Sequence, residues 1–261
     1  MTYFRIILTY FRLGVLGELE YRANFFVQIF ESLLGLVVAV GGLAIVFSHT
    51  ESVGGWLPAH LLALVGIHIL VGGLINMVIS PSMQRFMEDV RKGTLDFTLI
   101  KPSDAQLLVS VQRIEIWKLI DVGLGLTVLG IALVQLQAII GAAETAVFLL
   151  AMLCGAAIIY SFYLILATCS FWFIRVENIL EIFHSMYSAG RWPVGIYPTW
   201  LRFTLTFLVP VAFAVTVPAE GLTGRLTNRT LLEAVALAGT MVIAARLFWK
   251  VGIRYYSGAS A

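Results

Sequence analysis

The side chains that could do chemistry in this sequence of 261 residues are few and widely spaced. Two cysteines, Cys154 and Cys169, share one apolar run, where a helix would hold them about 22 Å apart, too far for a disulfide. No group of histidines, cysteines and carboxylates has the spacing of a metal site or a nucleophilic triad. The residues therefore give little support to an enzyme. The four histidines are His49, His60, His68 and His184.

Polar side chains inside long apolar runs are the remaining candidates. Glu31, His68 and Asn76 lie in such runs. Glu181 and His184 are three positions apart, on one face of a helix. If the runs cross a membrane, such groups are costly to bury and mark functional sites by default. Two interpretations stay open, a hydrogen-bonded contact between helices and the polar lining of a transport path, for which we select Glu181, His184 and His68.

The composition requires a membrane environment for these residues. Hydrophobic residues make up 60% of the chain and charged residues 12%, and the mean hydropathy is +0.94. A soluble domain is usually about half apolar and about a quarter charged, so a water-soluble surface could not be built from this chain. The net charge of +2 gives no indication of a nucleic-acid partner.

Five apolar runs reach the length of about 20 residues that a helix needs to cross a bilayer. A sixth region, 177–217, is ambiguous, and hydropathy favours 199–217 as its span. The sequence therefore predicts an all-α integral membrane protein, a single transmembrane domain over 1–261 with six transmembrane helices. The five clear runs are 25–47, 57–79, 119–136, 145–174 and 231–249.

The positions of lysine and arginine predict the orientation. The loop 80–118 is rich in both, whereas 48–56 and 137–144 contain neither. Because cytoplasmic loops carry the excess of positive charge, we expect both termini in the cytoplasm and a multi-pass protein of the inner (plasma) membrane. Residues 1–20 have a helical apolar stripe with Arg12 and Glu18 outside it, which predicts an interfacial amphipathic helix. A simple extension of the first span is the alternative.

The loop after the second run begins with a predicted amphipathic helix over 80–92. Ser80 suits an N-cap, Pro81 suits the first turn and Gly93 suits the stop. Two roles stay open, a cover for the end of the bundle and a docking helix for a soluble partner, since methionine and phenylalanine suit an adaptable contact. The apolar face, at i, i+3, i+4 and i+7, consists of Met83, Phe86, Met87 and Val90.

Two motifs point to a known family. The first is a basic pair, then Gly-Thr-Leu-Asp, then an apolar stretch that ends in Lys-Pro, and the second lies within 188–213, where Pro198 begins Pro-Thr-Trp-Leu. With the order of spans, they resemble the ABC-2 type permeases of type-2 ABC exporters, most closely the six-span daunorubicin-type subfamily. The resemblance covers essentially the whole chain. The first motif consists of Arg91, Lys92, Gly93, Thr94, Leu95, Asp96, Leu99, Lys101 and Pro102.

The resemblance implies that 80–105 is a cytoplasmic coupling loop, whose helix docks in a cleft of a separate ABC ATPase subunit. The sequence has no phosphate loop of the form G-x-x-x-x-G-K-[ST]. We therefore expect ATP and Mg on the partner, and no catalytic residue, metal or cofactor here. Asp96 is expected to cap or brace the turn after Gly93. The expected coupling residues are Arg85, Phe86, Met87, Glu88, Asp89, Val90, Arg91, Lys92, Gly93 and Asp96.

The resemblance also implies the topology of the ambiguous region. The fifth span would start near Glu177, and 198–217 would form a re-entrant hairpin that enters from outside. Pro198, Pro210 and Pro218 suit broken helices, and irregular backbone at membrane depth must be buried in protein or line a cavity. We favour this hairpin over a span at 199–217.

The expected function is that of a bacterial exporter's transmembrane subunit. A second permease, identical or related, would face this chain in the bilayer, and ATP hydrolysis by the partner would switch the pair between inward and outward access. Apolar walls along the path favour an amphipathic or lipidic substrate. A membrane-embedded enzyme and a non-transporting scaffold are the alternatives.

Overall fold

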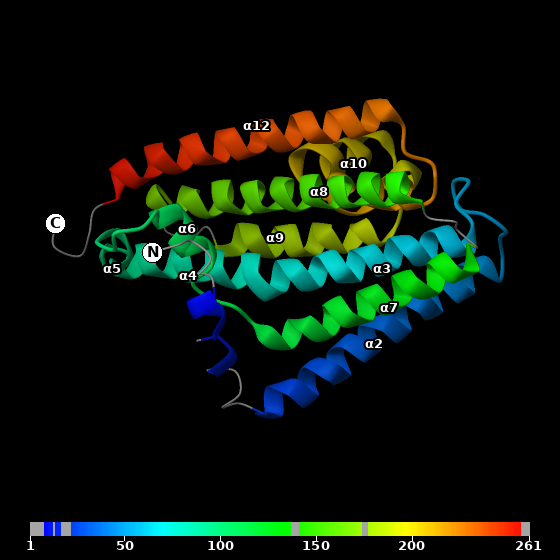
Figure 1. The fold of residues 1–261 in the computed structure, drawn as a ribbon, viewed down its shortest axis with the longest axis horizontal. Helices are drawn as coiled ribbons and strands as arrows, with labels where there is room; N and C mark the ends of the chain where they lie inside the picture. The colour runs from blue at the N-terminus through cyan, green and yellow to red at the C-terminus, as the bar shows by residue number, and fades with distance from the viewer. Residues whose placement is uncertain (1–7, 13, 17–21, 137–140, 174–176, 257–261) are drawn as a thin grey trace.

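The computed structural model describes residues 8–12, 14–16, 22–136, 141–173 and 177–256. The described chain is helical, and its long helices lie roughly side by side (Figure 1). Five helices are long and apolar enough to cross a membrane, at the places where the sequence predicts the five clear spans. The main helices are α2 (Arg22–Phe47), α3 (Pro58–Leu74), α4 (Ser80–Lys92), α7 (Leu119–Gln135), α8 (Ala142–Thr168), α9 (Glu177–Tyr187) and α12 (Asn228–Gly252).

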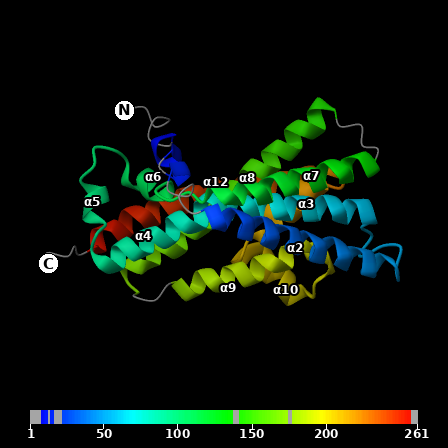
Figure 2. The ribbon, with the colours of Figure 1, turned by 90° about the horizontal axis from the view of Figure 1, so that it is seen from below.

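Short helices complete the two ends of the bundle. Residues 93–104 form what we call the loop end, and residues 48–57 form the far end. Both ribbon views place α4, α5 and α6 together at the loop end (Figures 1 and 2). The short helices are α5 (Asp96–Leu99), α6 (Ala105–Ser110), α10 (Thr199–Phe203) and α11 (Val217–Leu222).

The helix predicted over 80–92 is not separate from the second span. α3, a π-helical turn (Ile75–Ile79) and α4 form one continuous helix of 35 residues, Pro58–Lys92. At 1.5 Å per residue this helix is about 52 Å long, well beyond a hydrocarbon core of about 30 Å. It therefore extends from the far end through the bundle to the loop end.

The predicted N-cap at Ser80 is wrong for this reason. The Ser80 backbone N–H already bonds to the Ile75 carbonyl, so the helix has no free N-terminus there. Pro81 lacks the N–H that would reach the Met77 carbonyl. The Glu115 backbone N–H donates to that carbonyl instead, at 2.8 Å. An opposing segment thus satisfies the group that proline leaves unpaired, and the helix continues.

The region after α9 forms a bent pair of helices, the shape that the predicted re-entrant hairpin requires. Helices Thr199–Leu208 and Ala212–Leu222 meet at a bend of 79°, next to Pro210. Before the bend, Ile196 lies beside Gly54, whose Cβ would be 2.8 Å from its side chain. After the bend, the Arg225 guanidinium donates to the Gly55 carbonyl. Both ends of the segment therefore lie at the far end, which favours the hairpin over a straight span at 199–217.

Three further predictions concern the cysteines, the helix stop at Gly93 and the N-terminal helix. Cys154 and Cys169 are free, as the spacing predicts. α4 ends at Gly93, in the left-handed conformation (φ 69°), which confirms the predicted stop. Residues 8–12 and 14–16 are helical, and the rest of the predicted interfacial helix over 1–20 lies outside the described residues. Its place in a membrane interface stays a prediction.

Glycines bring α3 and α7 into backbone contact. A Cβ on Gly125 would lie 2.5 Å from the Leu70 nitrogen and 2.8 Å from the Gly66 carbonyl oxygen. A Cβ on Gly66 would lie 2.8 Å from the Leu129 nitrogen. Small residues at such crossings let membrane helices approach closely and gain van der Waals contact. This crossing fixes one wall of the cavity described below.

The crossing predicts a sharp difference between two glycine substitutions on α7. We expect Gly125→Ala to destabilise the folded chain by about 1–3 kcal/mol, because backbone atoms must move apart. Gly130→Ala is the control, since nothing lies within 4 Å of its added Cβ. Thermal unfolding of the detergent-solubilised chain measures both. Equal unfolding temperatures for the two variants would contradict the close packing.

Candidate substrate cavity and loop end

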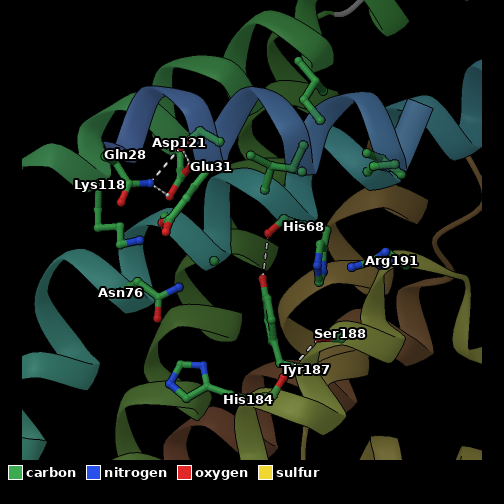
Figure 3. A pocket seen from close by; sticks show the side chains of 18 residues that line it. Gln28, Glu31, His68, Asn76, Lys118, Asp121, His184, Tyr187, Ser188 and Arg191 are labelled. Carbon is green, nitrogen blue, oxygen red and sulfur yellow. Dashed lines mark hydrogen bonds between the residues drawn. The ribbon is translucent and has the colours of Figure 1, made fainter. Parts of the chain in front are cut away.

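A cavity of about 390 Å³ lies between α2, α3, α7 and α9. Polar and charged side chains from all four helices line it (Figure 3). The lining of this cavity is therefore mixed, with apolar residues such as Leu36, Val65 and Ile69 beside the polar ones, and not uniformly apolar as expected for the path. The polar and charged residues of its lining are Gln28, Glu31, Ser32, His68, Asn76, Lys118, Asp121, His184, Tyr187, Ser188 and Arg191.

One wall is a hydrogen-bond network between α2 and α7. The Ser32 hydroxyl donates to one Asp121 carboxylate oxygen at 2.5 Å, and the Gln28 amide donates to the other at 3.3 Å. The Gln28 amide also donates to the Ser32 oxygen at 2.8 Å. Asp121 thus has neutral partners on both oxygens, and the network holds α2 on α7.

The opposite wall comes from α9 and α3. The Tyr187 hydroxyl donates to the His68 carbonyl at 2.8 Å, and the two rings stack with centroids 4.5 Å apart. His184 Nε2 lies 3.2 Å from the Ser80 hydroxyl and 3.5 Å from the Tyr163 hydroxyl. These contacts fix how α9 faces the long helix.

Three charged groups of the cavity have no ionic partner among the residues that the structure describes. Within the described ranges, Glu31, Lys118 and Arg191 make no hydrogen bond or ion pair through their side chains. Figure 3 shows Glu31 and Lys118 toward one side and Arg191 toward the other, beside the His68 ring. The buried His68 Nδ1 also has no hydrogen-bond partner in this part of the chain.

The cavity continues toward the loop end. Two adjoining spaces, of about 280 and 230 Å³, extend from it, and Lys118 lines all three. Arg113 and Glu115 line the outermost parts. Lys118, at the base of α7, is therefore shared by three neighbouring polar spaces, and Arg191 and His68 line the largest of these three.

The predicted path residues are only partly brought together. His68 and His184 line the cavity, whereas Glu181 is exposed and lines none of the three spaces. α9 turns Leu180 and Phe183 into the core, and this rotation leaves the neighbouring Glu181 outside. The sequence showed Asp121 as the lone charge of its apolar run, but nothing in it showed that Tyr187 or Arg191 faces the same space.

The apolar face of α4 is used inside the chain. Phe86 and Met87 are almost fully buried, and the Phe86 ring lies 5.6 Å from Phe171 and 5.2 Å from Trp249. The expectation that Phe86 and Met87 contact a partner is therefore corrected. Val90 also packs against this core as a partly buried side chain.

The polar face of α4 stays accessible and is internally paired. Glu88 pairs with Lys92 at 2.5 Å and with Arg85 at 3.5 Å. Asp89 is buried and accepts from the Thr94 hydroxyl at 2.8 Å. Asp89 therefore braces the turn after Gly93, the role expected of Asp96, which makes no N-terminal cap. Arg85, Arg91 and Lys92 are exposed.

The most exposed apolar side chains of the loop end lie on and next to α5. Phe97 is 69% exposed and Ile100 is 78% exposed. Lys101 and Pro102 follow directly and are exposed too. These two side chains therefore form an apolar pair on the surface of the loop end. Sequence analysis missed it because Phe97 and Ile100 lie in a stretch without helical periodicity.

A polar latch joins the loop end to α12 and α8. The Arg246 guanidinium donates to both Asp104 oxygens, at 2.5 and 3.1 Å, and to the Gln106 side chain at 2.6 Å. Tyr160 hydrogen-bonds to Gln106 and Ser110. The Arg246 hydrogen bond is the main cause that lowers the pKa of Asp104 below its ordinary value of 3.8. The latch makes α6 move with α12.

The latch predicts a defined pH dependence. Because the folded pKa of Asp104 is lowered, its ion pair stabilises the folded chain above pH 3.8 and is lost as pH falls through the folded pKa. We expect Asp104→Asn to cost about 1 kcal/mol, since both partners are partly exposed. The stability difference from the native chain should stay constant from about pH 8 to 5 and shrink at lower pH.

Thermal unfolding at a series of pH values checks this prediction. Glu233→Gln is the matched control, because its pair with Arg229 is well exposed and should contribute little. A difference for Asp104→Asn that changes between pH 8 and 5 would contradict the assignment of the latch.

Comparison with known proteins identifies the family. The model of the ABC-2 family transporter proteins matches residues 14–260. No curated protein and no solved structure matches the chain. Among the described residues, no group of three or more histidines, cysteines and carboxylates could hold a metal ion. The matched range covers every residue of the cavity, the long helix and the latch. The chain is therefore a multi-pass membrane protein that belongs to the ABC-2 family of transporter proteins.

Proposed function

We propose that this chain is the transmembrane subunit of an ATP-driven exporter. The observation that carries the proposal is the family match over 14–260, on a chain that is helical and membrane-spanning where described. ATP hydrolysis takes place on a separate ABC ATPase, because the sequence has no phosphate loop. The partner, and not this chain, binds ATP and Mg.

The loop end faces the cytoplasm and carries the ATPase contact. Its lysines and arginines support this orientation through the positive-inside rule, with Arg91, Lys92 and Lys101 exposed near the tip. Phe97 and Ile100 supply the apolar centre of the contact, and the polar face of α4 supplies its rim. Both termini then lie in the cytoplasm, in a bacterial plasma membrane. The rim consists of Arg85, Glu88, Arg91, Lys92, Gly93 and Asp96.

The long helix transmits the movement of the ATPase. A push on α5 reaches α4 directly, and α4 continues into α3 as one unbroken helix. The π-helical turn at Ile75–Ile79 is the point where this helix is most easily bent, as such turns often mark functional sites. Asn76, in this turn, lines the cavity. Movement at the loop end therefore reshapes the cavity wall.

A second permease completes the transporter. α2 exposes a row of large apolar side chains over most of its length, which suits lipid or a second membrane subunit. The cavity lies directly behind α2, so a subunit that packs there changes access to it. The exposed row consists of Phe26, Phe30, Leu34, Val37 and Val38.

The proposed contact predicts the effect of charges at the tip. We expect Phe97→Asp with Ile100→Asp to reduce the co-purified ATPase at least about tenfold, because a buried apolar contact would have to take up two carboxylates. The tagged full-length chain is purified from its native membrane. Vanadate-sensitive ATP hydrolysis and the presence of a chain with a phosphate loop are then measured in the eluate.

The controls separate docking from folding. Phe97→Leu with Ile100→Val keeps the apolar surface and should retain the ATPase. Both variants should remain in the membrane with native unfolding temperatures, since the two side chains are exposed. Full retention of the ATPase by the aspartate variant would refute the docking site. Hydrolysis that no compound stimulates in the reconstituted complex would favour a non-transporting scaffold.

A further inference from the structure

We propose that the cavity between α2, α3, α7 and α9 binds a zwitterionic polar group, with its anionic part at Arg191 and its ammonium part at Glu31. This inference rests on the proposed export function and names the substrate class of the same site. The chemistry is that of a phosphoethanolamine or amino-acid type group, which a lipid headgroup and a small soluble compound share.

The unpaired charges of the cavity are energetically costly. Ionisable side chains at membrane depth are expensive and normally pair with one another or face a water-filled space. Within the described part of the chain, the side chains of Glu31 and Arg191 make no hydrogen bond or ion pair. Both line the same cavity, yet Figure 3 shows them toward different sides of it. They are thus placed to contact a third group between them.

Asp121, the other carboxylate of the cavity, already has hydrogen-bond partners within the chain. Asp121 accepts from Ser32 and from Gln28, which occupies both of its carboxylate oxygens. Glu31 makes no comparable bond within the described residues, although it lies on the same helix as Ser32. The carboxylate that can receive an ammonium group is therefore Glu31. Lys118, at the junction of the three spaces, lies at the entry and not at the centre.

The groups around the Arg191 guanidinium suit an anionic ligand. A guanidinium presents several donors in a plane and suits the oxygens of a phosphate or carboxylate. The surrounding polar groups are His68 and Ser188, and no carboxylate from the lining lies beside Arg191 in Figure 3. The His68 Nδ1 is buried without a partner in the described chain. This side of the cavity therefore favours an anion.

The volume of the cavity limits the size of the ligand. A space of about 390 Å³ falls in the lower part of the range of small-molecule sites, about 300–1,000 Å³. It holds a headgroup or an amino acid, but not acyl chains as well. The chains of a lipid would remain on the apolar outer face of α2, where Phe30 and Val37 are exposed. A neutral overall ligand also fits a lining that has both signs of charge.

The test is lipid retention by the purified full-length chain, measured by native mass spectrometry. Phosphatidylethanolamine and phosphatidylglycerol are added in equal amounts. We expect retention of phosphatidylethanolamine about tenfold above phosphatidylglycerol, since a charge-assisted hydrogen bond lost or gained has about this effect. Arg191→Gln and Glu31→Gln should each lower this retention about tenfold. Arg191→Lys, which keeps the charge, should retain a measurable part.

Matched controls exclude general effects of charge and folding. Arg229→Gln removes an arginine from the exposed start of α12, outside the cavity, and should leave retention unchanged. Size-exclusion profiles of all variants monitor folding. A parallel titration with glycerophosphoethanolamine, the same headgroup without acyl chains, distinguishes the two sources of the chemistry.

The outcomes are separable. Retention of phosphatidylethanolamine that depends on Arg191 and Glu31 supports a lipid substrate, and binding of glycerophosphoethanolamine alone, with the same dependence, supports a soluble one. Equal retention of both lipids without glycerophosphoethanolamine binding, or binding that neither substitution changes, overturns the proposal. The measurement needs no ATPase, so its failure leaves the docking result unaffected, and failure of docking leaves this result unaffected.

Discussion

The constraint on which the rest of the structure depends is that backbone polar groups at membrane depth must be satisfied within the protein. Pro81 frees the Met77 carbonyl, and the Glu115 N–H takes the missing place from the opposing segment. That one bond keeps the second span and α4 continuous, and it fixes residue 115 at the base of α7 beside them. The same constraint explains the hairpin around Pro210, which returns to the far end inside the bundle.

Because the helix Pro58–Lys92 is continuous, it connects the loop end mechanically to the far end. A separate loop helix could rotate without moving the span before it. Here the apolar face of α4 is buried against Phe171 and Trp249, so α4 is part of the same rigid body as α8 and α12. The latch of Asp104 and Arg246 adds the α6 segment to that body. α9 joins the same core through Leu180 and Phe183, whereas α2 meets the cavity mainly through the polar bonds of Gln28 and Ser32 to Asp121.

Much of the fold could be predicted because long charge-free runs, proline positions and the glycine stop at Gly93 act locally. The residues that each helix face packs against could not be predicted in this way. The face of α4 at Met83 and Phe86 has the same spacing whether it meets a partner or its own bundle, and only the packing of α8 and α12 decides between them. Likewise, His68 and His184 are recognisable as polar residues in apolar runs. Arg191 becomes part of the site only because α9 ends short and the hairpin completes the crossing.

Among the described residues, charged side chains are paired at the loop end but unpaired in the cavity. This contrast favours a cavity that binds a ligand over one that is only a packing defect. At the loop end, where water would tolerate free charges, Glu88 is paired with Lys92 and Asp104 with Arg246. In the cavity, where unpaired charge at membrane depth is more costly, the exposed Glu31 and the half-buried Lys118 and Arg191 have no side-chain ion pair among the described residues. Selection for stability alone would produce the opposite distribution. The charges in the cavity are therefore best explained by a ligand that pairs with them for part of the transport cycle.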